Sequence, residues 1–155
     1  MCFTGHRSLS IREKSLLRTR LSGTLNLLYE QGARVFLSGG ALGYDTLAEQ
    51  CVLELRQAHP DVRLVIAVPC PSQAARWSPA DQRIYRDMLE AADQVLMISD
   101  TYFPGCMQKR NRFMVERAAV CLCYLTHCRG GTWNTVSLAY DLGRKIINLG
   151  DQDPS

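Results

Sequence analysis

The chain has 155 residues, 46% of them hydrophobic and 21% charged, as is ordinary for one soluble globular domain. No apolar run approaches the roughly 18 residues that a membrane span needs. The N-terminal MCFTGHRSLS lacks the apolar core of a signal peptide, so we expect a cytoplasmic protein without a membrane partner. A net charge of +3, without a long basic run, argues against a nucleic-acid partner.

The chain carries seven cysteines, and this odd number argues against a disulfide framework. Cys121 and Cys123 lie in the apolar run AAVCLCYL, which favours buried thiols that behave as small hydrophobic groups. A zinc site is the alternative, with candidate ligands Cys70, Cys106, Cys128, His6 and His127. None of these has metal-ligand spacing, so we predict neither a metal nor a cofactor.

Strands and helices are predicted to alternate from the first residue onward. The short apolar strand MCFT is followed by a capping box, Ser10 to Glu13, which opens a helix with leucines at spacings of three and four. Gly32 ends this helix. A strand at 34–38 and a helix at 45–58 follow, and Pro60 lies just beyond that helix.

The second half of the chain repeats the pattern. Strands are predicted at 62–69, 94–99, 120–125 and 145–149, with helices at 78–91, 107–118 and 135–142. This alternation predicts an α/β protein, a single Rossmann-like three-layer domain with a mostly parallel sheet of about six strands. We expect the domain to occupy residues 1–150 and a short C-terminal tail to occupy 151–155.

Ligands of parallel sheets bind beyond the carboxyl ends of the strands, so the loops after the strands are the candidates. They read TGHR, SGGALGYD, PCPSQAARW, SDTYFPGCMQKRNR and THCRGGTWNT. The candidate ligand-binding residues are Thr4, Gly5, His6, Arg7, Ser38, Gly39, Gly40, Gly43, Asp45, Trp77, Arg110, Asn111, Gly130, Gly131, Thr132, Asn134 and Thr135.

Two of these loops are rich in glycine and open a helix. In SGGALGYD, glycines allow close backbone approach to a ligand, and the helix that follows offers unpaired N–H groups to an anion. Asp45 either caps this helix or hydrogen-bonds ribose hydroxyls, or serves as an acid or base. RGGTWNT repeats the arrangement, so together the loops predict a two-sided phosphate site. Neither loop matches the G-x-G-x-x-G or Walker pattern.

Other loop residues have the chemistry to complete such a pocket. Trp77 either stacks on a base or packs on the sheet. Arg110, together with Asn111, is placed to clamp a phosphate or a ribose, because a guanidinium matches phosphate with two parallel hydrogen bonds.

Five segments of the chain resemble the YpsA-like branch of the SLOG superfamily, which also includes the DNA-processing protein DprA and the cytokinin-activating LOG enzymes. They are FTGHR, SGGALGYDTLAE, PCPSQAARWSPADQRIY, GCMQKRNRFMV and GGTWNTVSLA. The resemblance implies a Rossmann-like fold and a site for a nucleotide-derived ligand. It assigns functional roles to Gly39, Gly40, Gly43 and Asp45 in the first glycine loop and to Gly130, Gly131 and Thr132 in the second.

The resemblance also implies what such proteins do: nucleotide or ADP-ribose-type sensing, with links to cell division and, by genomic association, to phage conflict. LOG enzymes carry P-G-G-x-G-T-x-x-E, whereas RGGTWNTVSLAYD lacks the glutamate. We therefore expect binding or sensing of a nucleoside phosphate, NAD or ADP-ribose type of ligand. The alternatives are an N-glycosidic or phosphoribosyl hydrolase with Asp45, or Glu49, as the catalytic acid, and DprA-like binding of single-stranded DNA. The resemblance implies a homo-oligomer, since SLOG relatives commonly associate, and a sensor is expected to pass its signal to a protein partner.

Overall fold

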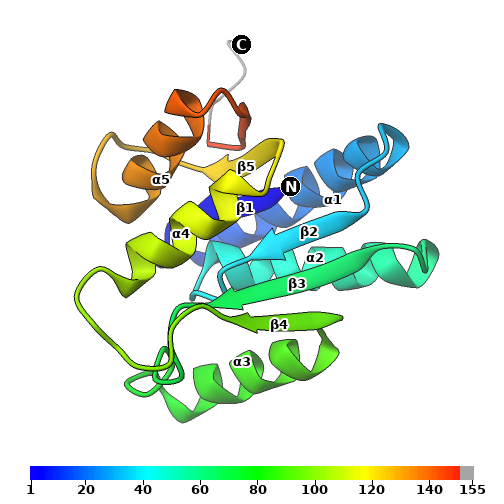
Figure 1. Ribbon diagram of the computed structural model, residues 1–155. Helices are drawn as coiled ribbons and strands as arrows, with labels where there is room; N and C mark the ends of the chain where they lie inside the picture. The colour runs from blue at the N-terminus through cyan, green and yellow to red at the C-terminus, as the bar shows by residue number, and fades with distance from the viewer. Residues whose placement is uncertain (151–155) are drawn as a thin grey trace.

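The structure is a computed structural model that describes residues 1–150, and the predicted tail at 151–155 lies outside the described residues. Its strands are β1 (Cys2–Gly5), β2 (Val35–Ser38), β3 (Arg63–Val68), β4 (Gln94–Met97), β5 (Val120–Tyr124) and β6 (Lys145–Asn148). Its helices are α1 (Ile11–Glu30), α2 (Tyr44–Ala58), α3 (Pro79–Ala91), α4 (Cys106–Glu116) and α5 (Gly130–Asp141). The strands form one parallel sheet in the order β4-β3-β2-β1-β5-β6 (Figure 1). The predicted α/β class is confirmed.

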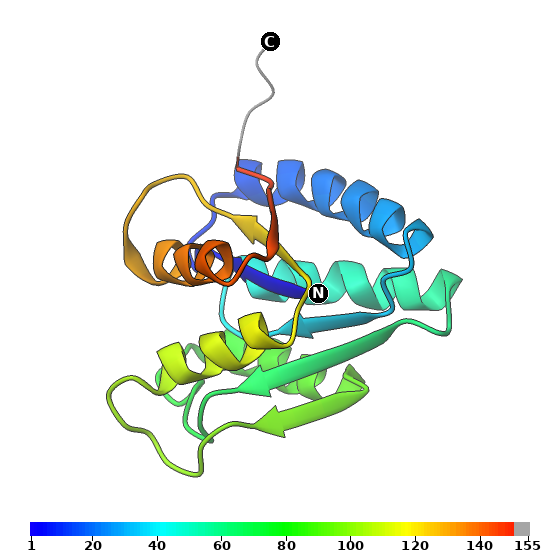
Figure 2. The ribbon, with the colours of Figure 1, turned by 45° about the horizontal axis from the view of Figure 1, so that its top comes forward.

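Two hydrophobic cores flank the sheet, because alternate residues of each buried strand face opposite sides. In β3, Leu64, Ile66 and Val68 belong to the core under α1 and α2, while Val65 and Ala67 belong to the core under α4 and α5. Figures 1 and 2 show these helices as layers on the two faces, with α3 beside the β4 edge. The domain therefore has three layers, with the sheet between two layers of helices.

Helix starts agree closely with the sequence signals. Ser10 Oγ accepts a hydrogen bond from the Glu13 N–H, and Glu13 Oε1 accepts one from the Ser10 N–H, which completes the predicted capping box. At α3, Ser78 Oγ accepts a hydrogen bond from the Asp81 N–H at 3.1 Å, with Pro79 at the first helical position. These caps fix the residues at which α1 and α3 begin, after the loops that follow β1 and β3.

The predicted start of α5 at residue 135 is wrong, because the helix begins at Gly130. The two glycines of RGGTWNT, which have low helix propensity, form its first turn instead of a loop. Other element boundaries differ from the prediction by no more than two residues, as is usual for strand and helix ends. No helix within residues 1–150 is both long and apolar enough to span a membrane.

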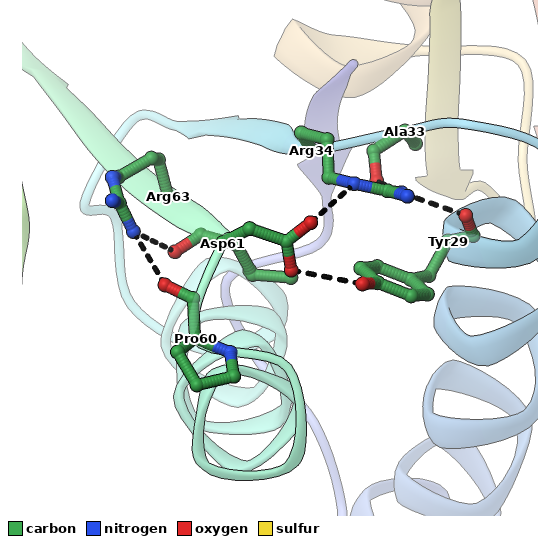
Figure 3. A network of polar contacts seen from close by, with 7 residues as sticks. Tyr29, Ala33, Arg34, Pro60, Asp61 and Arg63 are labelled. Carbon is green, nitrogen blue, oxygen red and sulfur yellow. Dashed lines mark hydrogen bonds and ion pairs between the residues drawn. The ribbon is translucent and has the colours of Figure 1, made fainter.

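A polar cluster ties the end of α1 to the turn before β3 (Figure 3). Tyr29 donates its hydroxyl proton to Asp61 Oδ1 at 2.8 Å, and Arg34 Nε pairs with Asp61 Oδ2 at 2.8 Å. The Arg34 guanidinium also lies 3.8 Å from the centre of the Tyr29 ring. This cluster lies at the amino edge of the sheet, where strands β2 and β3 begin, so it braces the end opposite the candidate ligand loops.

Candidate functional site

A cavity of about 770 Å³ opens at the carboxyl edge of the sheet, where β1 and β5 are neighbours. The chain crosses to opposite faces after these two strands, through α1 and α5, so the cavity lies at the topological switch point where ligands bind in such folds. Its walls come from the loops after β1 and β5 and from α2, α4 and α5. The candidate residues that line it are Thr4, Gly5, His6, Arg7, Asp45, Arg110, Asn111, Gly130, Gly131, Thr132, Asn134 and Thr135.

The N-terminus of α5 forms one wall of this cavity. Arg129 occupies the cap position, and no side chain within residues 1–150 caps the first turn. Apart from the adjacent residues and the backbone of the same helix, no described atom lies within 4 Å of where a Cβ on Gly130 or Gly131 would stand. Thr132 is buried in the same turn, and Thr135 donates its hydroxyl proton to the Gly131 carbonyl at 2.9 Å. Open space beside uncapped N–H groups is the arrangement that holds an anion.

Asp45 lies in the first turn of α2 and presents one oxygen without a partner. Its Oδ2 accepts a hydrogen bond from the Ala41 N–H at 3.2 Å, whereas Oδ1 is buried and has no hydrogen-bond partner among the described residues. Burial raises the pKa of Asp45 from 3.8 to about 6, against the opposing effect of Arg110. A buried acceptor of this kind at a cavity wall calls for a donor from a ligand.

Arg110 spans from α4 to the loops after β2 and β3. Its Nη1 donates to the carbonyl oxygens of Gly39 and Ala67 and to Oε1 of Gln73, the last two at 3.2 Å. Its Nε donates to Oδ1 of Asn111 at 2.8 Å. The guanidinium is 2% exposed, so its main role is to hold these loops together beneath the cavity.

In the first glycine loop, the space that a side chain would take at each glycine is occupied by other parts of the protein. A Cβ on Gly39 would lie 2.7 Å from Arg110 Cζ, and one on Gly43, whose φ is +75°, would lie 2.3 Å from the Arg7 carbonyl oxygen. Gly40, at φ +69°, faces Ile66. None of the three lines the 770 Å³ cavity. Close approach between loops therefore explains these glycines within the described residues.

Three further candidates lie behind or beside the cavity instead of in its wall. Ser38 donates to Glu49 Oε1 at 2.6 Å and accepts from the Gly40 N–H at 3.2 Å. Glu49 is 2% exposed, and burial raises its pKa from 4.5 to about 8. Trp77 packs edge-on against Tyr85, with ring centres 5.1 Å apart, and lines a separate cavity of about 160 Å³ together with Gly43.

The cavity also contains residues outside the candidate ligand-binding set. His127 and Arg129, from the loop after β5, line it, as do Lys109 and Arg112 of α4. His127 was considered only as a zinc ligand, yet its ring stacks on His6 with centres 4.4 Å apart. The pairing of β1 with β5 places these loops side by side. No local pattern in the sequence predicts this pairing.

Comparison with solved structures shows that the fold is shared with DNA-processing proteins. The DprA structure from Streptococcus pneumoniae aligns with 99% of this chain and 51% of its own, with a TM-score of 0.70 and 18% identity. DprA from Helicobacter pylori, described for its single-stranded DNA binding mode, aligns with 99% of this chain and 66% of its own, with a TM-score of 0.67 and 19% identity.

Sequence comparison gives nearer relatives. The uncharacterized SPbeta prophage-derived protein YoqJ of Bacillus subtilis is 31% identical over 138 residues, which are 79% of this chain and 80% of YoqJ. The UPF0398 protein BH1768 of Halalkalibacterium halodurans is 32% identical over 115 residues, which are 73% of this chain but only 58% of that protein. The family model YpsA, described as the YspA SLOG family, matches residues 1–136. The chain therefore belongs to this SLOG family.

Proposed function

We propose that the protein binds a nucleotide-derived ligand in the 770 Å³ cavity, with a phosphoryl group at the N-terminus of α5 and a ribose hydroxyl at Asp45. The observation that carries this proposal is the buried, unpartnered Oδ1 of Asp45, which shares a cavity with uncapped helical N–H groups. The volume lies within the range of small-molecule sites and suits a ligand larger than a free phosphate.

The two ends of the cavity, at Asp45 and at the N-terminus of α5, differ in chemistry, and this difference sets the orientation of the ligand. A carboxylate only accepts hydrogen bonds, so Asp45 pairs with a donor such as a ribose hydroxyl and repels a phosphoryl oxygen. The α5 terminus offers N–H donors and a partial positive charge, with the Arg129 and Arg7 cations in the same cavity. A nucleoside phosphate carries both groups, joined at a short distance.

A thermal-shift and calorimetric comparison of AMP, ADP-ribose and NAD with 2′-deoxy-AMP tests the proposal. A ligand at 100 times its dissociation constant raises the free energy of unfolding by about 2.7 kcal/mol. We expect a ribonucleotide to bind more tightly than its deoxy form. Asp45→Ala should weaken the affinity for the ribonucleotide by about 10- to 100-fold, because a hydrogen bond to a charged group contributes about 1.5–3 kcal/mol.

Asp87→Ala is the matched control, since this aspartate is exposed on α3 and lies outside the cavity. Absence of binding by every nucleotide, or equal binding by the wild type and Asp45→Ala, contradicts the proposal. Gly43→Ala is a poor probe of the site, because its Cβ would meet the Arg7 backbone and disturb the fold. The incubated samples also decide between sensor and enzyme: intact ligand supports binding, released base supports a hydrolase, and loss of that release in Asp45→Asn assigns Asp45 as the acid.

Single-stranded DNA is the second candidate, favoured by exposed cations of α4 that also border the cavity. Lys109 and Arg112 are exposed there, and Lys109 Nζ lies 5.8 Å from the centre of the Phe103 ring, beside the exposed Tyr102. Cations next to aromatic rings suit a nucleic-acid backbone with stacked bases. Oligothymidylate binding measured by fluorescence anisotropy, with Lys109→Ala and Phe103→Ala, tests this. Such binding should be salt-dependent and unaffected by Asp45→Ala, because internal deoxynucleotides offer no sugar hydroxyl.

A further inference from the structure

Two histidines from neighbouring loops meet in the cavity wall. His6 follows β1, and His127 follows β5, and their rings stack with centres 4.4 Å apart and planes 3° from parallel. Thr126 lies between them: its N–H points at His6 Nε2 at 3.0 Å, and its hydroxyl lies 3.1 Å from His6 Nε2 and 3.3 Å from His127 Nδ1. These contacts join the β1 loop to the loop that leads into α5.

The direction of the main-chain hydrogen bond fixes the state of His6. A backbone N–H only donates, so His6 Nε2 must be the acceptor and carries no proton. The neutral ring then holds its proton on Nδ1. Protonation of His6 would place an N–H group against the Thr126 N–H at a spacing of 3.0 Å, which removes this main-chain hydrogen bond and leaves the Thr126 hydroxyl oxygen, 3.1 Å away, as the acceptor for Nε2.

The surroundings of the pair also favour neutral His6. Its pKa is lowered from 6.5, first by burial and then by His127, while Glu13 at the start of α1 acts in the opposite direction. Tyr124 of β5 lies edge-on to the His6 ring at 5.6 Å. The remaining charged groups that share the cavity are Arg7, Asp45, Lys109, Arg110, Arg112 and Arg129, so cations predominate.

We propose that His6 is a proton-controlled latch on the loop between β5 and α5. Neutral His6 holds Thr126, and with it the segment from Arg129 to Thr132 that forms the anion-binding turn. Protonated His6 releases the main chain of Thr126 and contacts only its hydroxyl, so the turn loses the main-chain hydrogen bond that ties it to the β1 loop. The effect of the latch on ligand binding rests on the function proposed above, whereas the latch itself is a property of the free protein.

The free protein is tested first, by NMR titration between pH 4.5 and 8. The chain contains only three histidines, His6, His59 and His127, so their ring signals can be assigned with single His→Gln variants. We expect His6 to titrate below 6.5 and the Thr126 amide signal to move with the same midpoint. In His6→Gln, whose Oε1 accepts the Thr126 N–H at every pH, that amide should not move. The latch is contradicted if the Thr126 amide signal does not change with the midpoint of the His6 titration.

Ligand coupling is tested with sulfate, whose charge is constant over this pH range. One pH unit below the His6 midpoint about a tenth of the protein keeps the latch, so affinity for sulfate should fall about tenfold relative to its value well above the midpoint. Because Asp45 also titrates near pH 6 in the same cavity, all these proteins carry Asp45→Asn, and in that background His6→Gln should lose this pH dependence. His59→Gln is the matched control and should keep it, because His59 stacks on Tyr29 at 3.9 Å, away from the cavity.

The two experiments separate failure of the latch from failure of the site. Equal pH dependence of sulfate affinity with and without His6→Gln overturns the latch while the anion site stands. If sulfate binds at no pH but the Thr126 amide follows the His6 midpoint, the latch is supported and the proposed ligand site is contradicted.

Discussion

The guanidinium of Arg110 lies directly against the Cα of Gly39, so the identity of one residue constrains the other. Arg110 Nη1 donates to the Gly39 carbonyl oxygen, and a Cβ on Gly39 would stand 2.7 Å from both Cζ and Nη1. The contact connects α4 to the loop after β2, which leads into α2 and Asp45. The buried guanidinium of Arg110 therefore packs against the glycine-rich loop and constrains its conformation.

Gly39→Ala should destabilise the protein by about 1–3 kcal/mol, because the added methyl group displaces a well-packed side chain. Urea unfolding measures this as a lower midpoint. Gly131→Ala is the control, since its Cβ position has no described atom within 4 Å apart from adjacent residues and its own helix backbone, and alanine favours a helix. Equal midpoints for Gly39→Ala and wild type would contradict the packing of Arg110 against this loop.

Arg110→Met should lower the free energy of unfolding by about 3 kcal/mol or more. It removes the side-chain donor of the Ala67 carbonyl and of Gln73 Oε1, while the Gly39 carbonyl keeps only Gln73 Nε2 at 3.2 Å, and an unsatisfied buried group costs about 1–3 kcal/mol. Arg110→Lys should recover only part of this loss, because an ammonium group does not reproduce the planar fork. Arg112→Met is the control: its pair with Glu116 is exposed and should change stability by less than about 1 kcal/mol.

The alternation of strands and helices was predictable because its signals are local. The capping box at Ser10 and the serine–proline start at residue 78 depend on neighbouring residues alone, and the structure has both. The start of α5 was missed because two glycines oppose a helix by propensity, whereas here they form its first turn.

The site was predicted less completely because it depends on contacts between distant segments. That Asp45 and Gly131 both lie at the carboxyl edge of the sheet was predictable from the order of strands and loops, whereas their sharing one cavity depends on the pairing of β1 with β5. That Gly39, Gly40 and Gly43 face the protein's own side chains and backbone depends on partners up to 71 residues away, as in the contact of Gly39 with Arg110. Single-sequence patterns do not specify such partners.

Asp45→Asn should stabilise the ligand-free protein at pH 7.5. Burial raises the pKa of Asp45 from 3.8 to about 6, so the folded state holds a proton that the unfolded chain releases. Stability therefore falls as pH rises through this window, and by pH 7.5 the loss is about 3 kcal/mol at about 1.36 kcal/mol per pKa unit. The neutral isostere avoids this loss. Urea unfolding at pH 4 and 7.5 should show the variant's advantage only at the higher pH.

Glu49→Gln should flatten the pH dependence of stability over a wider window. Burial raises the pKa of Glu49 from 4.5 to about 8, so its ionisation opposes folding increasingly as pH rises from about 4.5 to 8. Glutamine keeps an oxygen for the Ser38 hydroxyl, which donates to Glu49 Oε1 at 2.6 Å. Urea midpoints at pH 5, 6.5 and 8 should diverge from wild type progressively, in favour of the variant.

Glu54→Gln is the control for that series, because Glu54 is half-exposed and pairs with Arg18 at the surface. Its midpoints should parallel those of the wild type at all three pH values. A double variant, Asp45→Asn with Glu49→Gln, then separates the two carboxyl groups. They lie one helical turn apart on α2, and the charge of Asp45 raises the pKa of Glu49. Removing Asp45 should therefore shrink the gain from Glu49→Gln, whereas additive gains would show that the two groups ionise independently.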